Sequence, residues 1–278
     1  MRLTFVGCGS AFNMTDYQSN MLVEVDEAVP CPPAESGAQP GTQLGTQFGI
    51  KSVKRRMLLD CGMTAPLALA DLKVTTGEID ALYISHQHAD HIGGIEWLAF
   101  TRFFTPGSTR PLMFVNESLA DDLWEHSLKG GLASIEGRIC TMETYFDVRK
   151  VPMNDSFLFG GVSFTPIQTV HIMNGFGIVP SYGLIFKSPA GKSVFVTTDT
   201  QFTPYQLARF YKEADVIFQD AETSKFKSGV HAHYTDLKTL APEIRRKMWL
   251  YHFQPGELPD AKADGFAGFV RRGQAFEL

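Results

Sequence analysis

Four side chains that bind metal ions well fall within six consecutive residues, 86–91, with the sequence HQHADH. In an extended turn, residues two apart point to the same side, so His86 and His88 can share one ion. Asp90 and His91 follow where a helix is predicted to begin, and they can face a second ion. Imidazole and carboxylate ligands together suit zinc, with manganese or iron as alternatives. The motif therefore predicts a metal site beside a strand end.

Strand and helix patterns alternate along the rest of the chain. β-branched and aromatic content predicts strands at residues 1–7, 20–25, 56–60, 81–85, 112–115, 157–165, 182–187, 193–198, 215–218 and 248–251. Helices are expected from about residue 94, at 204–213 and at 235–249, the last with Thr235 as its N-cap. No linker divides the sequence. We therefore expect an α/β sandwich formed by a single domain, residues 1–278.

Residues 26–50 differ from their surroundings because they contain four prolines and four glycines, and they repeat Gly-Thr-Gln. This composition predicts a long flexible loop, an insertion at about 27–52, between two strands that form a hairpin. Structureless loops of this length are usually functional or disordered. A substrate-facing flap and a disordered insertion both remain open.

Charge, hydropathy and cysteine content argue against some classes of protein. The formal net charge of −5 argues against a protein that grips nucleic acid by bulk electrostatics. No apolar run is long enough to span a membrane, and the first strand is too short for a signal-peptide core. The four cysteines, at positions 8, 31, 61 and 140, form no CxxC pair, so we do not expect a disulfide framework. A reducing, cytoplasmic location is expected instead.

The HxHxDH pattern after a strand resembles the signature of metallo-β-lactamase-fold hydrolases. The resemblance extends from residues 7–11 to His252 and implies an αββα sandwich of two mixed sheets flanked by helices, with the active site at one edge. Superfamily members that perform redox chemistry on two irons typically carry an acidic residue at the position of His88. The histidine here favours hydrolysis.

The resemblance also implies a complete set of ligands, because the family needs a further His, a bridging Asp and a last His downstream. His171, Asp199 and His252 each end a predicted strand and match these positions. One ion would be bound by His86, His88 and His171, and the other by Asp90, His91 and His252, with Asp199 between them. A bridging hydroxide, with Asp90 among the catalytic residues, would attack the substrate. Asp60 matches a position behind the metals, where it could orient a ligand histidine or simply bond the following turn.

A second resemblance, to the tRNA 3′-end-processing ribonucleases and related phosphodiesterases, concerns the region before His252. Those enzymes carry an acidic residue and then a His-x-Ser/Thr segment that opens a helix, and Glu222 and His233 are similar to them. Such a His protonates the departing oxygen and the acidic residue orients it. His231 is a competing candidate for this role. His126 matches no family position and is interpreted as a surface residue.

The tRNA-processing enzymes insert a long arm between the third His and the bridging Asp, and residues 171–199 leave no room for it. Stable tRNA binding is therefore not expected. We expect a two-metal phosphodiesterase, most readily with two Zn²⁺ ions per chain, that acts on a small or nucleotide-like phosphodiester such as a cyclic nucleotide. The alternatives are hydrolysis of a lactone, thioester or amide bond and a non-enzymatic metal-binding protein. Relatives are often homodimers, which predicts a homodimer here.

Overall fold

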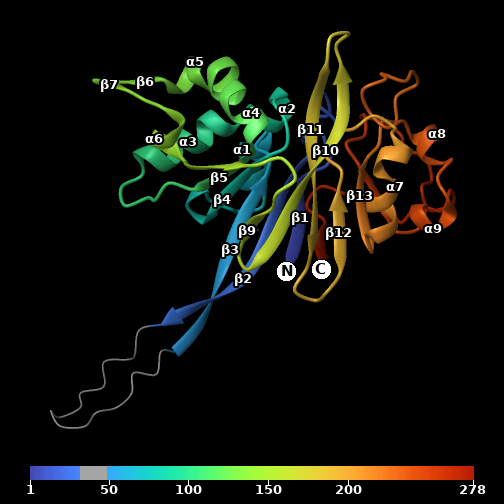
Figure 1. The fold of residues 1–278 in the computed structure, drawn as a ribbon, viewed down its shortest axis with the longest axis horizontal. Helices are drawn as coiled ribbons and strands as arrows, with labels where there is room; N and C mark the ends of the chain where they lie inside the picture. The colour runs from blue at the N-terminus through green and yellow to red at the C-terminus, as the bar shows by residue number, and fades with distance from the viewer. Residues whose placement is uncertain (32–48) are drawn as a thin grey trace.

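The computed structural model describes residues 1–31 and 49–278, and two mixed seven-stranded sheets face each other at its centre (Figure 1). The first sheet has the strand order β16 (Ala275–Glu277), β1 (Arg2–Gly7), β2 (Asn20–Cys31), β3 (Gly49–Leu59), β4 (Ala81–Ile84), β5 (Leu112–Asn116) and β8 (Asp147–Val151). The second has the order β15 (Gly268–Phe269), β14 (Met248–Tyr251), β13 (Val216–Asp220), β12 (Ser193–Val196), β11 (Ile178–Lys187), β10 (Val162–Met173) and β9 (Phe157–Phe159). A small hairpin joins β6 (Ser134–Ile135) to β7 (Arg138–Ile139).

Helices cover the outer face of each sheet (Figure 1). Those on the first sheet are α1 (Ala65–Asp71), α2 (Ala89–Ile92), α3 (Ile95–Phe104), α4 (Glu117–Asp122), α5 (Lys129–Leu132) and α6 (Met142–Tyr145), with a π-helical turn at Leu123–Leu128 and a 3₁₀ turn at Thr76–Glu78. Those on the second are α7 (Pro204–Glu213), α8 (Tyr234–Leu237) and α9 (Pro242–Arg245). The predicted αββα sandwich is confirmed.

The core lies between the two sheets, where large apolar side chains from each meet. Phe5 of β1 contacts Phe218 of β13 and Tyr251 of β14, with ring centroids 5.2 and 5.3 Å apart. All three side chains are buried. Burial of aromatic surface is the main favourable term in such a core, so this contact fixes the two sheets against each other.

Each sheet is antiparallel in one part and parallel in the other. The parallel parts are β3-β4-β5-β8 in the first sheet and β12-β13-β14-β15 in the second. Loops that follow the carboxyl ends of parallel strands are the usual position of ligand sites in α/β proteins. This arrangement brings residues that are distant in sequence to one edge of the sandwich.

The β2–β3 hairpin is longer than the sequence predicted. Its strands pair from Met21 with Leu59 to Cys31 with Gly49, so residues 27–31 and 49–52 are strand. Figure 1 shows the paired strands extending away from the sheets. The rest of the predicted loop, 32–48, lies outside the described residues.

The predicted helix at 235–249 is wrong. The structure has two short helices there, α8 and α9, and residues from Met248 form β14. Pro242 explains the break, because proline lacks an amide hydrogen and disfavours helical geometry in the residue before it. The N-cap of α8 is His233, not the predicted Thr235.

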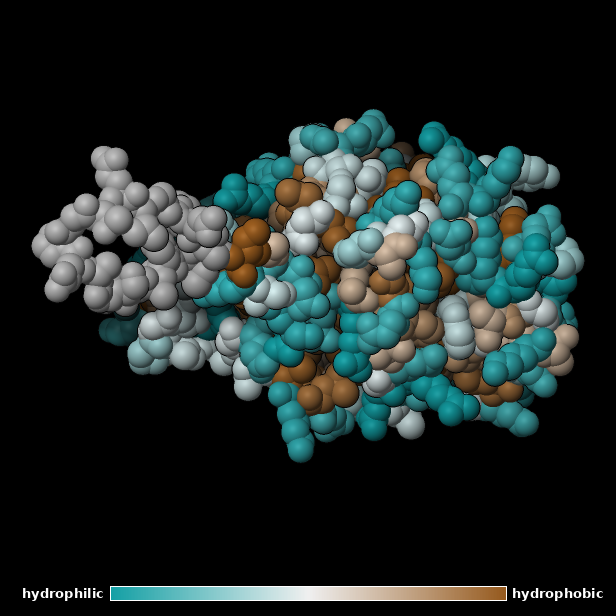
Figure 2. Space-filling view, turned by 90° about the horizontal axis from the view of Figure 1, so that it is seen from below, coloured by the Kyte–Doolittle hydropathy of each residue, from teal (hydrophilic) through white to brown (hydrophobic). Residues whose placement is uncertain are grey.

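Seen from below, the surface is mostly hydrophilic, with scattered apolar patches between the hydrophilic residues (Figure 2). Among the described residues, no helix is long and apolar enough to cross a membrane.

Candidate metal centre

Four of the seven predicted ligands lie at or near strand ends of the two sheets, and the other three lie at the N-cap of α2 or within it. His86 follows β4, Asp199 follows β12 and His252 follows β14, while His171 lies two residues before the end of β10. The register of β10 shifts between Val170 and Ile172, which is a bulge at His171. Bulges commonly redirect a side chain beside an active site.

These residues form two groups of converging ligand atoms. The first contains His86, His88, His171 and Asp199, and the second contains Asp90, His91, Asp199 and His252. Within each group the ligand atoms lie within 4.8 Å of one another. Asp199 belongs to both groups, which is the position that the resemblance implied for a bridging carboxylate.

The imidazole nitrogens point toward the shared carboxylate. Asp199 Oδ2 lies 3.6 Å from His86 Nε2, 3.8 Å from His171 Nε2 and 3.4 Å from His252 Nε2. Asp199 Oδ1 lies 3.3 Å from His91 Nε2. His88 alone presents Nδ1, which lies 3.2 Å from His86 Nε2 and 3.1 Å from His171 Nε2.

Hydrogen bonds on the far side of the rings fix these orientations. Asp60 Oδ2 accepts from His91 Nδ1 at 2.7 Å and from the Ser85 hydroxyl at 2.6 Å. Val230 O accepts from His171 Nδ1 at 2.9 Å. Asp60 therefore orients the ring of His91, a candidate ligand, and such outer contacts usually set both ring orientation and ligand basicity.

The close approach of the HxHxDH turn to the first sheet requires glycine. A Cβ on Gly62 would lie 1.8 Å from the carbonyl oxygen of Asp90, and one on Gly94 would lie 2.5 Å from that of Gly62. Non-glycine residues also adopt left-handed backbone conformations at three strand ends, Asp60, Thr198 and His252. Such conformations cost free energy and concentrate at functional sites.

The electrostatics separate the histidines into two classes. Burial lowers the pKa values of His86, His88 and His171, so these rings are neutral and offer lone pairs. Burial opposes the charge on His91 and His252 as well, but nearby carboxylates, with Asp199 foremost, raise their pKa values well above normal.

The donor set fits a pair of divalent cations. Among the described residues, the buried atoms His91 Nε2 and Asp199 Oδ1 have no hydrogen-bond partner, although each lies within a cluster of polar atoms. Burying unpartnered polar atoms is costly, and a cation between them would satisfy both. The groups supply three imidazoles with a carboxylate, and two imidazoles with two carboxylates, which are ligand sets suited to zinc.

A third group adjoins the other two and contains Asp199, Asp220, His231 and His252. His231 Nδ1 donates to Asp220 Oδ2 at 2.8 Å, and its ring centroid lies 4.6 Å from that of His252 and 5.1 Å from that of His171. Burial disfavours the charged ring, but Asp220 outweighs it and raises the pKa of His231. The sequence favoured His233 over His231 and gave no role to Asp220, although Asp220 is the last residue of a buried strand.

Glu222 and His233 do not contact the candidate ligands in the way that Asp220 and His231 do. The Glu222 carboxylate accepts from the Ser224 hydroxyl and from the Ser228 amide, and among the described residues none of its hydrogen bonds involves the His233 ring. His233 Nδ1 accepts from the Thr235 amide, and Nε2 donates to Ser224 O at 2.9 Å. Both residues therefore stabilise the surrounding loop, which differs from the predicted pairing of Glu222 with the His233 ring.

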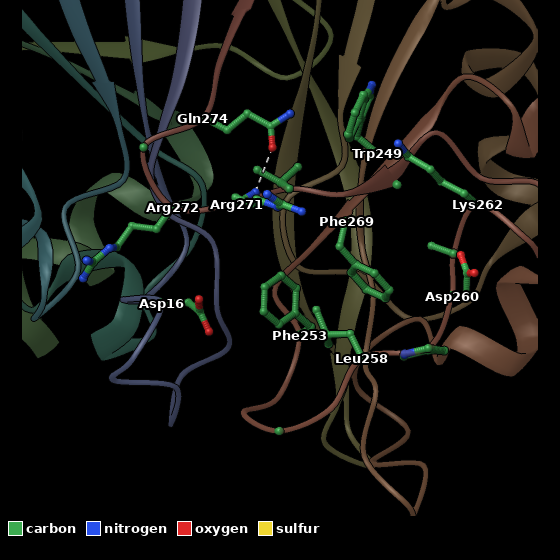
Figure 3. A pocket seen from close by; sticks show the side chains of 16 residues that line it. Asp16, Trp249, Phe253, Leu258, Asp260, Lys262, Phe269, Arg271, Arg272 and Gln274 are labelled. Atoms are coloured by element: carbon green, nitrogen blue, oxygen red, sulfur yellow. Dashed lines mark hydrogen bonds between the residues drawn. The ribbon is translucent and has the colours of Figure 1, made fainter.

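His126, which the sequence predicts to be a surface residue, and a large cleft near the C-terminus both lie outside these groups. The side chain of His126 is 75% exposed. A cleft of about 900 Å³ is lined mainly by the C-terminal segment, with Phe253, Phe269 and Arg271 among its walls (Figure 3). None of the seven predicted ligands lines it. The candidate site is therefore identified by its converging donor atoms and not by concavity.

Comparison with known proteins identifies the family of this chain. The family model described as anti-Pycsar protein Apyc1 matches residues 43–276. The chain belongs to the Apyc1 family. Relatives named anti-Pycsar protein Apyc1 include one from Paenibacillus harenae, 32% identical over 91% of this chain and 90% of its own length, and one from Bacillus phage vB_BveM-Goe7, 28% identical over 91% and 88%.

Solved structures share the fold of this Apyc1 family member at low identity. The metallo-β-lactamase-fold protein YhfI from Bacillus subtilis matches with a TM-score of 0.68 at 16% identity, covering 99% of this chain and 98% of its own. A diphosphatase of the PhnP family matches with a TM-score of 0.67 at 19% identity, covering 100% and 97%. These similarities establish the metallo-β-lactamase fold.

Proposed function

We propose that this protein is a metal-dependent phosphodiesterase that hydrolyses a cyclic nucleotide. The observation that carries the proposal is the Asp220–His231 pair, which lies directly against the candidate ligands His171 and His252. A proton donor in this position is what cleavage of a phosphodiester needs, because the departing alkoxide is a poor leaving group.

The seven residues that converge on Asp199 would hold two divalent ions, which we expect to be zinc. When bound, such ions lower the pKa of a shared water and offset the negative charge that develops on the phosphoryl oxygens. Asp60 would keep His91 in its ligand orientation, and Val230 O would do the same for His171.

His231 is better placed than His233 to donate the proton. Its Nδ1 is bonded to Asp220, its Nε2 has no hydrogen bond to any described residue, and its side chain is 15% exposed. Nε2 is therefore available to a substrate. In His233, by contrast, both ring nitrogens are engaged by Thr235 and Ser224. Asp220 would hold the His231 ring and stabilise its charged form.

Two observations support a small substrate. β10 and β11 are joined by the short turn of residues 174–177, so the chain between His171 and Asp199 contains no arm for gripping tRNA. Membership of the Apyc1 family suggests a cyclic-nucleotide substrate. A mononucleotide also agrees with the negative net charge, because a small phosphate can be held by metal ions without a basic surface.

The test is hydrolysis of a substrate panel by zinc- or manganese-loaded protein. The panel holds cyclic CMP, UMP, AMP and GMP, bis(p-nitrophenyl) phosphate, a lactone and a β-lactam, with chelator-treated protein as control. We expect turnover of at least one cyclic nucleotide to a linear monophosphate. Turnover of the lactone or β-lactam without any phosphodiester would overturn the proposal and favour the alternative C–O or C–N hydrolase.

A further inference from the structure

The segment 223–230 connects Glu222 to His231, and Glu222 itself holds the segment in shape. Both carboxylate oxygens of Glu222 accept from the Ser228 amide, at 3.1 and 3.0 Å, and one also accepts from the Ser224 hydroxyl at 2.8 Å. Glu222 is buried. A buried carboxylate that accepts several hydrogen bonds fixes the groups that donate to it, so the loop has a defined shape.

The loop is also bonded to the candidate metal centre at one end and to a neighbouring residue at the other. Near its start, the Thr223 amide donates to Gln254 Oε1, and Gln254 lies two residues after His252. At its end, Val230 O accepts from His171 Nδ1. Figure 1 shows this segment, between β13 and α8, at the same edge of the molecule as the β10–β11 hairpin. The loop is therefore part of the rim of the site.

Phe226 lies in the middle of this loop and is 85% exposed. Single exposed apolar residues are common and need no explanation by themselves. This one differs because a buried carboxylate fixes its loop, one end of which is bonded to His171 and the other to Gln254, two residues after His252. An exposed aromatic ring on a fixed loop at the rim of a site for nucleotides is a surface on which a base can stack.

We propose that Phe226 stacks on the base of the substrate, and that Glu222 is a positioning residue that holds the Phe226 loop. The inference rests on the proposed cyclic-nucleotide activity. It assigns base recognition to the loop 223–230 and leaves the phosphate to the metal centre and to His231. Stacking is tolerant of base identity because every base has an aromatic face, so the loop would raise affinity for nucleotides in general.

The experiment measures KM and kcat of Phe226→Ala on two substrates. One is cyclic CMP, and the other is methyl riboside 3′,5′-cyclic phosphate, which keeps the sugar and the phosphodiester but has no base. Loss of stacking should raise KM for cyclic CMP by about 5- to 100-fold and leave kcat nearly unchanged. On the base-free substrate the variant and the wild type should have equal KM. Phe226→Trp should restore the KM for cyclic CMP.

Further variants separate the loop from general surface effects. Phe104→Ala, which removes an exposed phenylalanine from the end of α3, is the matched control and should change neither KM. Glu222→Ala should raise KM for cyclic CMP without loss of bound metal. In the double variant Phe226→Ala/Glu222→Ala, the two increases in KM should not add, because both substitutions remove the same contact with the base.

The outcomes distinguish this inference from the function on which it rests. If the wild type hydrolyses no cyclic nucleotide, the proposed function fails. If it does hydrolyse cyclic CMP, but Phe226→Ala keeps the wild-type KM, the inference is wrong and the function stands. The inference is also overturned if KM rises equally on the base-free substrate, since the ring would then only support the loop.

Discussion

Two acid–histidine pairs with the same sequence spacing lie side by side in this protein, and they make different contacts. Asp220 and His231 are bonded to each other and adjoin the candidate ligands. Glu222 and His233 form a backbone bridge, while their side chains bond to the loop between them and to the start of α8. Residue type and spacing therefore do not identify a catalytic pair; the neighbours of each ring do.

The comparison also shows how one short segment can serve two purposes. The first pair lies against the candidate metal centre, and the second fixes the loop that surrounds it. The side chains of Glu222 and His233 are occupied by hydrogen bonds within the loop, so we expect their substitution to change stability or substrate binding. Substitution of Asp220 or His231 should instead change catalysis or metal binding. The following predictions test this division, beginning with the largest effect.

Removal of metal should abolish hydrolysis. We expect about two ions per chain by elemental analysis, and complete loss of activity after chelation that is restored by zinc or manganese. Asp199→Ala should lose ions of both groups, because its carboxylate is common to them. Full activity with one ion or none would contradict the two-metal assignment.

His231→Ala should lower kcat by about 10²–10⁴-fold on a cyclic nucleotide, the usual contribution of general acid catalysis. The loss should be much smaller on bis(p-nitrophenyl) phosphate, because nitrophenolate departs without a proton. Steady-state kinetics on both substrates measure this difference. The matched control is His233→Ala, which should show no dependence on the leaving group. If His233→Ala shows the dependence on the leaving group and His231→Ala does not, His233 is the general acid and our assignment is wrong.

Asp220→Asn should lower activity or metal affinity by about 10- to 100-fold, as is typical for residues that orient ligands. Its effect is expected to reach both neighbours, because Asp220 Oδ2 accepts from His231 and Oδ1 lies 3.5 Å from His252 Nδ1. Metal titration and kcat measured on the same preparation separate the two effects. An unchanged metal affinity together with unchanged kcat would remove Asp220 from the site.

His233→Ala should have the smallest effect on catalysis and a measurable effect on stability. His233 is the N-cap of α8, and loss of an N-cap costs about 0.5–2 kcal/mol. Urea unfolding of the metal-loaded variant should show this decrease, with bound metal equal to that of the wild type. A loss of metal would instead identify His233 as a ligand.

Much of the candidate site was predictable because its residues follow local rules. The HxHxDH motif is contiguous, so its geometry depends only on an extended turn followed by a helix. His171, Asp199 and His252 were predicted to end strands, and strand ends in a sandwich of this kind meet at one edge. Asp60 could be placed behind the metals but not assigned a partner. The contact with His91 depends on how β3 lies beside β4, which only the folded sheet determines.

The errors came from places where local pattern left two structures equally possible. The helical spacing of apolar residues at 235–249 did not take account of Pro242, which separates α8 from α9. The predicted loop at 26–50 was read from composition, yet its flanking residues pair as strands as far as Cys31 and Gly49. Cross-strand hydrogen bonding overrides a weak local preference when a partner strand is present.

The sequence by itself determined the fold class, the seven candidate ligands and the presence of an acid and a histidine before His252. Only the tertiary structure showed which of His231 and His233 adjoins the candidate ligands. In an extended segment, residues two apart point to the same side, so the strand pattern of the sequence cannot distinguish His231 from His233. The two residues nevertheless lie about 6.6 Å apart along the chain. That displacement exceeds the reach of a hydrogen bond, and the backbone pairing of the segment with Glu222, just after β13, sets which histidine adjoins His252.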